Sequence, residues 1–337
     1  MPAAAGTGFR SGSVAPARTG LVVKQTMKPT PELPWGAGVR AGAGADTAES
    51  MAVRAMCRWL AYSGSAIHLE EVLYKPAHSL IDQSRHARLG IETTNGDGFG
   101  VGWYEDDGAG PHGGDPAVFR GIGPAWSDAN LRELSHCVRS PLFFAHIRAS
   151  TGTEVQQTNC HPFRYGRWLW MHNGAIHGFP DLKRDLALAV DPSLYSSIKG
   201  STDSELMFYL ALTLGLEDDT PRAVARMIGL IGAVARRHGV PDPLQMTVAT
   251  SDGERLWAFR YSTAHTSRSL FYSTDVGALR AVHPESETLR HLSDETRLVV
   301  SEPLGDLSGA WNEVPESCYG VIQEGQDEMH ALEPAAA

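Results

Sequence analysis

Cysteine is scarce in this chain of 337 residues, and long apolar runs are missing. Its four cysteines are widely and irregularly spaced: Cys57, Cys137, Cys160 and Cys318. They form no Cys-x-x-Cys pair and are too few for a disulfide scaffold. No stretch approaches the roughly 18 apolar residues of a membrane-spanning helix, and the N-terminus lacks the apolar core of a signal peptide. These absences favour a protein of the reducing cytoplasm.

An excess of positive charge is also missing. Lys and Arg number 29 against 39 Asp and Glu, which gives a formal net charge of −10. This balance argues against nucleic acid or an anionic membrane as the main partner. Hydrophobic residues make up 42% of the chain and include eight Trp, enough for a substantial core in one large domain or two small ones.

Residues 1–55 are rich in Ala, Gly and Pro and show no helix or strand periodicity, so we expect a disordered extension. Three explanations stay open: a start codon assigned too early, a propeptide, or an organelle transit peptide. We favour the early start. Met56 is an available internal start, and its removal would leave Cys57 at the N-terminus.

Cys57 opens the apolar run 59–62 and is the candidate nucleophile. A terminal cysteine combines a thiol of pKa about 8.5 with an α-amine of pKa about 7.7–8.0, so nucleophile and base share one residue. A buried free cysteine serves packing more often than chemistry. The assignment therefore depends on motifs further along the chain.

The apolar run 142–147 predicts a buried strand that ends at Arg148. Burying an arginine is costly unless it meets an anion. Its planar fork suits a substrate carboxylate, and a structural salt bridge is the alternative.

A second predicted strand, 167–172, ends at Asn173 and Gly174. An amide beside a glycine N–H suits the oxyanion of a tetrahedral intermediate, each donor contributing about 3–4 kcal/mol, although Asn-Gly pairs are also common turns. Further on, Thr202 and Glu205 have the spacing of a capping box, which places Asp203 in a first helical turn. There Asp203 either complements the helix dipole or binds a substrate ammonium.

Three histidines lie near these motifs, namely His146, His161 and His172. They lack the i, i+4 spacing of a helical zinc pair, so we expect neither a metal nor another cofactor. Strands, two central helices and more strands predict an α+β layered body over residues 57–323, followed by a flexible tail at 324–337.

Taken in order, these motifs resemble those of the class II glutamine amidotransferases, which are N-terminal nucleophile hydrolases. That family has an N-terminal cysteine, a strand ending in His-x-Arg, a His-Asn-Gly segment and a Thr/Ser-Asp-x-Glu helix start. The corresponding residues here are Cys57, 146–148, 172–174 and 202–205. The resemblance implies a four-layer αββα sandwich and an amidohydrolase that forms a γ-glutamyl thioester.

The resemblance also implies a role for each site residue. Cys57 would be the nucleophile and its α-amine the base, with Asn173 and Gly174 forming the oxyanion hole. Arg148 and Thr151 would bind the α-carboxylate of the glutamyl group. Asp203 would bind its α-ammonium.

From Cys57 to about Phe208 the chain resembles more closely the amidotransferase-type subunit of the fungal DUG glutathione-degradation complex. This implies hydrolysis of glutathione to glutamate and cysteinylglycine, with a metallopeptidase-type partner protein. Three alternatives stay open. They are a glutaminase that delivers ammonia to a separate synthetase, a hydrolase of another γ-glutamyl conjugate, and a non-catalytic regulatory subunit in which Cys57 is blocked.

Overall fold

The computed structural model describes residues 57–89, 94–105, 114–150 and 153–336. The expected extension 1–55 and the candidate residue Thr151 lie outside these ranges. Everything below refers to the described part of the chain, which belongs to one compact unit.

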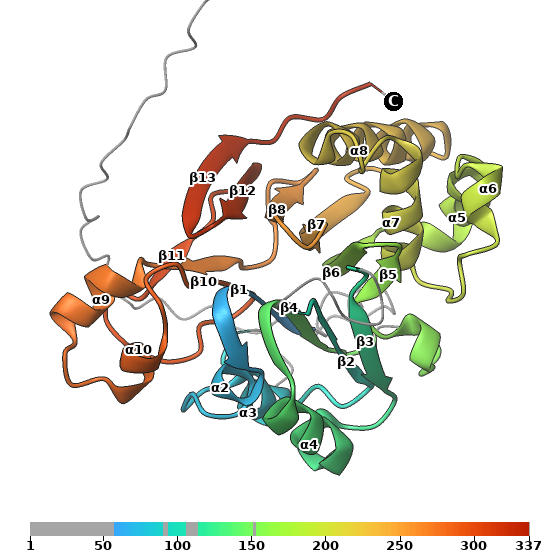
Figure 1. Ribbon diagram of the computed structural model, residues 1–337. Coiled ribbons are helices and arrows are strands. Elements are labelled where there is room, and N and C mark those ends of the chain that lie inside the picture. Colours follow the sequence, from blue (N-terminus) through green and yellow to red (C-terminus); the bar gives the residue numbers. More distant parts are fainter. Residues whose placement is uncertain (1–56, 90–93, 106–113, 151–152, 337) are drawn as a thin grey trace, which may run out of the picture. The chain divides into compact units, whose positions relative to one another are not determined.

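The strands form two antiparallel sheets (Figure 1). The first contains β1 (Arg58–His68), β2 (Phe99–Trp103), β3 (Ala117–Gly121), β4 (Arg139–Ile147), β9 (Phe271–Ser273), β10 (Arg297–Val300) and β11 (Trp311–Glu313), in the order β11-β9-β10-β1-β4-β2-β3. The second contains β5 (Phe163–Tyr165), β6 (Trp168–Ile176), β7 (Leu244–Ser251), β8 (Leu256–Ser262), β12 (Cys318–Gln323) and β13 (Gln326–Ala331), in the order β13-β12-β8-β7-β6-β5.

Helices cover the outer face of each sheet (Figure 1). On the first sheet lie α2 (Glu70–Leu73), α3 (Leu80–His86), α4 (Ala129–Cys137), α9 (Val276–Val282) and α10 (Glu287–His291). On the second lie α5 (Phe179–Leu188), α6 (Pro192–Tyr195), α7 (Asp203–Thr213) and α8 (Thr220–Arg237). Single 3₁₀ turns occur at Ala125–Ser127 and Gln157–Asn159.

The alternation of side chains along β1 explains the layering. Trp59 and Ala61 pack into the core between the two sheets, whereas Leu60 and Tyr62 pack under the helices of the first sheet. Successive strand residues point to opposite faces, so a strand covered on both sides reads as a continuous apolar run. A third core joins the second sheet to α5, α7 and α8. The four-layer αββα sandwich that we expected is therefore confirmed.

The start of α7 follows the predicted capping pattern in part. Thr202 is the N-cap, and its hydroxyl accepts the Glu205 N–H at 3.2 Å. The Glu205 carboxylate does not return to the cap. It accepts the N–H groups of Lys199 and Gly200, at 3.0 and 2.6 Å. These hydrogen bonds fix the backbone before and within the first turn of α7, and Asp203 is the first residue of the helix.

The C-terminal segment differs from the flexible tail expected at 324–337. Gln326–Ala331 form β13, which pairs antiparallel with β12. Beyond it Leu332 is buried, and the N–H of Ala335 donates to the carbonyl of Ala225 in α8 at 3.0 Å. The expectation was wrong for these residues because a strand paired at a sheet edge needs backbone partners rather than apolar side chains. Among the described residues, no helix has the length and apolar character needed to cross a bilayer.

Candidate active site

The predicted site residues meet around Cys57, which directly precedes β1. Cys57, Arg148, Gly174 and Asp203 line one cavity of about 280 Å³. Asn173 does not line the cavity, but its side chain is hydrogen-bonded to Cys57. Strand pairing explains part of this convergence, because β4 runs beside β1 with Ile147 opposite Arg58. Arg148 therefore follows the end of β4 next to the start of β1.

The thiol of Cys57 lies against the backbone just beyond β4. Its Sγ accepts the N–H of Ala149 at 3.3 Å and lies 3.4 Å from the Ala149 carbonyl oxygen. Burial raises the pKa of the thiol, and the Ala149 N–H and the nearby Arg268 and Arg148 act in the opposite direction. Since burial dominates, the neutral thiol is favoured, and a base is needed to form the nucleophile.

Asn173 is held in one orientation by two neighbours. Its Nδ2 donates to the Cys57 carbonyl at 2.7 Å, and its Oδ1 lies 3.0 Å from Nε2 of His146. Burial lowers the pKa of His146 to about 3, so the ring is neutral near pH 7 and donates from Nε2. An amide nitrogen carries two N–H groups. One is used by Cys57, and the other remains for an oxyanion.

Gly174 occupies a position that only glycine fits. Its φ of +143° is rare for residues with a side chain, and a Cβ atom would lie 1.9 Å from the carbonyl oxygen of Gln245. The requirement comes from the close approach of β6 to β7 at this point. The backbone beside Asn173 is consequently fixed in a conformation that other residues cannot adopt.

Arg148 is a buried cation held by neutral oxygens. Its Nη1 donates to the Asp97 carbonyl at 3.2 Å, and its Nη2 donates to the hydroxyls of Ser150 and Thr153 at 3.1 and 2.5 Å. Within the part of the chain that the structure describes, no carboxylate lies within ion-pair distance. The structural salt bridge that the sequence left open is therefore not found there. A buried guanidinium of this kind is suited to an incoming anion.

Asp203 lines the same cavity and is the first residue of α7. Its Oδ2 accepts the N–H of Ile176, and its Oδ1 accepts the N–H of Ser204, both at 2.8 Å. The Ser204 hydroxyl also lies 2.8 Å from Nδ1 of His172 and 3.3 Å from the carboxylate. Each carboxylate oxygen can accept a further hydrogen bond, so a cationic donor can still be bound.

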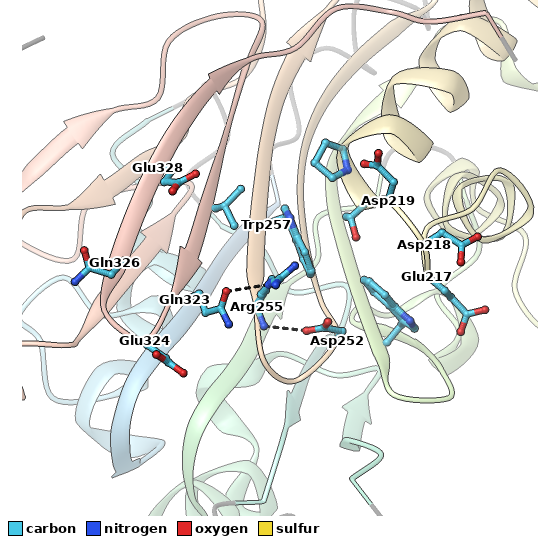
Figure 2. Close-up of a pocket in the computed structure, with 14 residues that line it drawn as sticks. Glu217, Asp218, Asp219, Asp252, Arg255, Trp257, Gln323, Glu324, Gln326 and Glu328 are labelled. Carbon is cyan, nitrogen blue, oxygen red and sulfur yellow. Dashed lines mark hydrogen bonds between the residues drawn. The ribbon is translucent and has the colours of Figure 1, made fainter. Parts of the chain in front are cut away.

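A larger hollow of about 720 Å³ lies elsewhere, between the β7–β8 turn, the start of α8 and the β12–β13 hairpin (Figure 2). Its acidic lining residues are Glu217, Asp218, Asp219, Asp252, Glu324 and Glu328. Among the described residues that line it, Arg255 is the one basic residue, and its Nε donates a hydrogen bond to the side-chain oxygen of Gln323 at 2.9 Å. A concentration of carboxylates disfavours an anionic ligand, and the described residues that line the hollow include no cysteine. The smaller cavity at Cys57 is therefore the candidate site.

Comparison with known proteins agrees with this geometry. The sequence model of the class II glutamine amidotransferases matches residues 75–336. The chain belongs to this family. It is 34% identical to the probable glutamine amidotransferase DUG3 of Saccharomyces cerevisiae over 304 residues, covering 82% of this chain and 84% of that protein. It is 26% identical to the gamma-glutamyl-hercynylcysteine sulfoxide hydrolase of Mycolicibacterium smegmatis over 208 residues, covering 60% of this chain and 78% of that protein.

Solved structures show the same fold. A glutamine aminotransferase class-II domain protein from Silicibacter pomeroyi superimposes with a TM-score of 0.62 at 33% identity, covering 83% of this chain and all of that one. Glutamine phosphoribosylpyrophosphate amidotransferase from B. subtilis superimposes with a TM-score of 0.55 at 15% identity, covering 83% and 50%. The class II amidotransferase described here is thus an enzyme of the amidohydrolase type.

Several residues of this amidotransferase site were not predicted. Thr153 accepts a hydrogen bond from the guanidinium of Arg148. Thr151, the expected second contact to the α-carboxylate, lies outside the described residues. Ser204 links His172 to Asp203, and it went unnoticed because it lies inside the helix-start motif. Two sequence signals could have indicated these residues. Thr153 places a hydroxyl in the loop after β4, and Ser204 places one between Asp203 and Glu205.

His161 also lines the cavity of the amidotransferase and was not assigned a role. Its ring stacks on His146 with 4.2 Å between centroids, and burial lowers its pKa well below the usual value. Neither ring nitrogen has a hydrogen-bond partner among the described residues. Over the same residues no group of three or more His, Cys, Asp or Glu side chains is arranged to hold a metal.

The backbone of Cys57 is fixed by a buried ion pair. Arg58 donates from Nη1 to the Cys57 carbonyl at 3.2 Å, and its Nε pairs with Glu302 at 2.9 Å. Glu302 also lies 2.5 Å from Nε2 of His78. No sequence pattern pointed to this contact, because Glu302 follows β10 far along the chain. The pairing of β10 with β1 brings it to the site.

Proposed function

We propose that this enzyme hydrolyses the γ-glutamyl bond of glutathione and releases glutamate and cysteinylglycine. The observation that carries the proposal is the cavity of about 280 Å³ shared by Cys57, Arg148 and Asp203. A thiol, a buried guanidinium without a carboxylate partner in the described structure and a carboxylate suit the three functional groups of a γ-glutamyl head. The resemblance to glutathione-degradation subunits favours glutathione among such substrates.

Substrate binding in this proposal uses charge at both ends of the glutamyl group. Arg148 binds the α-carboxylate through its fork, with Thr153 and Ser150 holding the guanidinium in place. Asp203 binds the α-ammonium. Thr151 is retained as a second contact to the α-carboxylate. The γ-carbonyl then lies at Cys57, within reach of Asn173 and Gly174.

The reaction requires Cys57 to be N-terminal, since an amide nitrogen is not basic. The segment 1–56 is therefore absent from the active protein, and the amidotransferase domain begins at Cys57. The α-amine takes the thiol proton, and the thiolate forms a C–S bond to the γ-carbon. The Asn173 amide and the Gly174 N–H stabilise the oxyanion. The C–N bond then breaks, and the leaving amine takes the proton from the Cys57 ammonium.

The second half of the reaction restores the enzyme. A water molecule gives a proton to the free α-amine and attacks the γ-glutamyl thioester, again through an oxyanion. The C–S bond breaks, the thiol recovers a proton, and glutamate leaves. Cysteinylglycine is a dipeptide, so a metallopeptidase-type partner protein in the cytoplasm is the proposed consumer of the other product.

A second candidate is hydrolysis of another γ-glutamyl conjugate. The mycobacterial relative is named as a hydrolase of gamma-glutamyl-hercynylcysteine sulfoxide, and such a substrate has the same glutamyl head. A glutaminase that delivers ammonia to a separate synthetase is the third candidate. All three use the residues named above and differ in the leaving group.

The test compares glutamate release from glutathione and from glutamine by protein that begins at Cys57. Preference for glutathione supports the proposal, and preference for glutamine replaces it with ammonia delivery. Cys57→Ala is expected to abolish glutamate release while the circular dichroism spectrum stays unchanged. Retained activity in Cys57→Ala would refute the mechanism. If neither substrate releases glutamate and Cys57 is confirmed as N-terminal, the result would point to a regulatory subunit.

A further inference from the structure

Arg268 lies in the loop between β8 and β9, which is anchored on both sides of the residue. Before it, the Thr266 carbonyl accepts a hydrogen bond from the Gln245 side chain at 2.6 Å. After it, the Ser269 hydroxyl donates to the Ser301 carbonyl at 2.8 Å. The half-buried Arg268 is therefore carried by a fixed segment of backbone.

Both anchors adjoin the candidate site. The carbonyl oxygen of Gln245 is the atom that excludes a Cβ at Gly174. The N–H of Ser301 donates to the carbonyl of Trp59, two residues after Cys57, and the Trp59 N–H donates to the Ser301 hydroxyl. The segment that carries Arg268 is thus hydrogen-bonded to Gln245 at the start of β7 and to Ser301, the partner of Trp59 at the start of β1. The positive charge of Arg268 lowers the pKa of the Cys57 thiol, and its effect is larger than that of Arg148 or Arg58.

The charges around Cys57 are not balanced within the described structure. Three guanidinium groups act on the thiol, and Arg58 is paired with the buried Glu302 at 2.9 Å. Neither Arg148 nor Arg268 has a carboxylate partner in the described ranges. Two cations at one site are matched by a ligand with two anionic groups. A γ-glutamyl head supplies one, the α-carboxylate.

We propose that Arg268 binds a carboxylate on the leaving group, so that the enzyme selects γ-glutamyl peptides over glutamine and over γ-glutamyl amides with uncharged leaving groups. This inference rests on the proposed function and names the feature that sets its substrate class. Arg268 does not line the cavity at Cys57. A leaving group lies beyond the γ-carbon and outside the contacts that hold the glutamyl head, so its carboxylate is left for a cation that is not part of the cavity lining.

The experiment uses pairs of substrates that differ in one carboxylate. Glutathione is compared with its glycyl ethyl ester, which has the same peptide without the terminal negative charge. For Arg268→Gln we expect kcat/KM for glutathione to fall about 10- to 100-fold, mainly through KM, and for the ester to change less than about twofold. Arg268→Lys restores part of the loss because it keeps the charge without the fork.

The matched control is Arg255→Gln, which removes an exposed guanidinium from the acidic hollow. We expect it to leave kcat/KM unchanged for both substrates. An equal loss for glutathione and its ester in Arg268→Gln would mean that Arg268 acts only through the ionisation of Cys57. That result, or a wild-type enzyme that treats both substrates alike, would overturn the inference.

Binding to Cys57→Ala protein, measured by calorimetry, separates this inference from the proposed function. Weaker binding of glutathione on adding Arg268→Gln, with unchanged binding of the ester, supports the inference even if the wild type releases no glutamate. Glutamate release that depends on Cys57 but not on Arg268 leaves the proposed function standing and refutes the inference. Absence of both turnover and Arg268-dependent binding refutes both.

Discussion

The side-chain amide of Asn173 donates to the backbone carbonyl of Cys57 at 2.7 Å, which joins the candidate oxyanion donor to the candidate nucleophile. His146 fixes the amide from the other side at 3.0 Å. The orientation of the amide is thus set before any substrate binds. Donors that need no reorganisation stabilise a developing charge most effectively.

Asn173→Ala is expected to lower kcat for glutamate release by about 10²- to 10³-fold and to leave KM nearly unchanged. The reason is that the amide acts on the oxyanion, which is present only after attack on the γ-carbonyl. Steady-state kinetics with glutathione measure both parameters. Asn312→Ala, which removes an exposed amide bonded to Thr274, serves as the control. A rise in KM with an unchanged kcat would exclude an oxyanion role.

Gly174→Ala is expected to abolish activity and to reduce the free energy of unfolding by at least about 1–3 kcal/mol. Its φ of +143° disfavours a side chain, and the new Cβ would lie 1.9 Å from the Gln245 carbonyl oxygen. Denaturant titration with a parallel activity assay tests both effects. Gly232→Ala in α8, where the nearest atom lies 3.5 Å away, should instead stabilise by about 0.5–1 kcal/mol. Equal stability of the two variants would contradict this account of β6.

The sequence was sufficient to predict the elements whose apolar residues follow a clear period. Pro221 in a first helical turn and the apolar spacing of the residues after it are sufficient to predict a helix from Thr220, and α8 begins at that residue. The runs 245–250 and 256–261, separated by a turn signal at 251–253, are likewise sufficient to predict two strands, which are β7 and β8. Periodicity does not reveal an edge strand with polar side chains, so β13 was missed, since its pairing depends on backbone groups.

Local motifs predicted four residues that line the candidate cavity: Cys57 before β1, Arg148 after β4, Gly174 within β6 and Asp203 at the start of α7. Contacts that depend on sheet register could not be predicted. Glu302 reaches Arg58 through the pairing of β10 with β1, and Arg268 reaches the site through a loop without any pattern. A charged residue in such a loop resembles any surface residue until the strands around it are placed.

Arg148→Lys is expected to raise KM for glutathione about 10- to 100-fold, with a smaller effect on kcat. The lysine keeps the positive charge but loses the planar fork that suits a carboxylate. It also cannot reach the Asp97 carbonyl and the Thr153 hydroxyl together as Arg148 does. Initial rates over a range of glutathione concentrations measure the change. Arg167→Lys, an exposed arginine paired with Glu254, is the control. An unchanged KM would remove Arg148 from the carboxylate site.

The buried histidines predict a loss of stability in acid. Burial lowers the pKa of His146 to about 3 and that of His161 well below the usual value. Below about pH 6.5 the unfolded chain binds protons that these folded rings do not bind, so the free energy of unfolding falls as the pH falls. Each such ring contributes a slope of up to about 1.4 kcal/mol per pH unit.

His161→Phe tests this directly, because the ring has no hydrogen-bond partner among the described residues and can be replaced by an apolar one. The variant is expected to lose less stability between pH 6.5 and about pH 4 than the wild type, by roughly the slope of one ring. Urea titrations at several pH values measure the slope. Phe163→Leu, which changes the ring packed 4.5 Å from His161, should shift stability by a similar amount at every pH. Parallel pH profiles for His161→Phe and the wild type would show that His161 takes up its proton in the folded state.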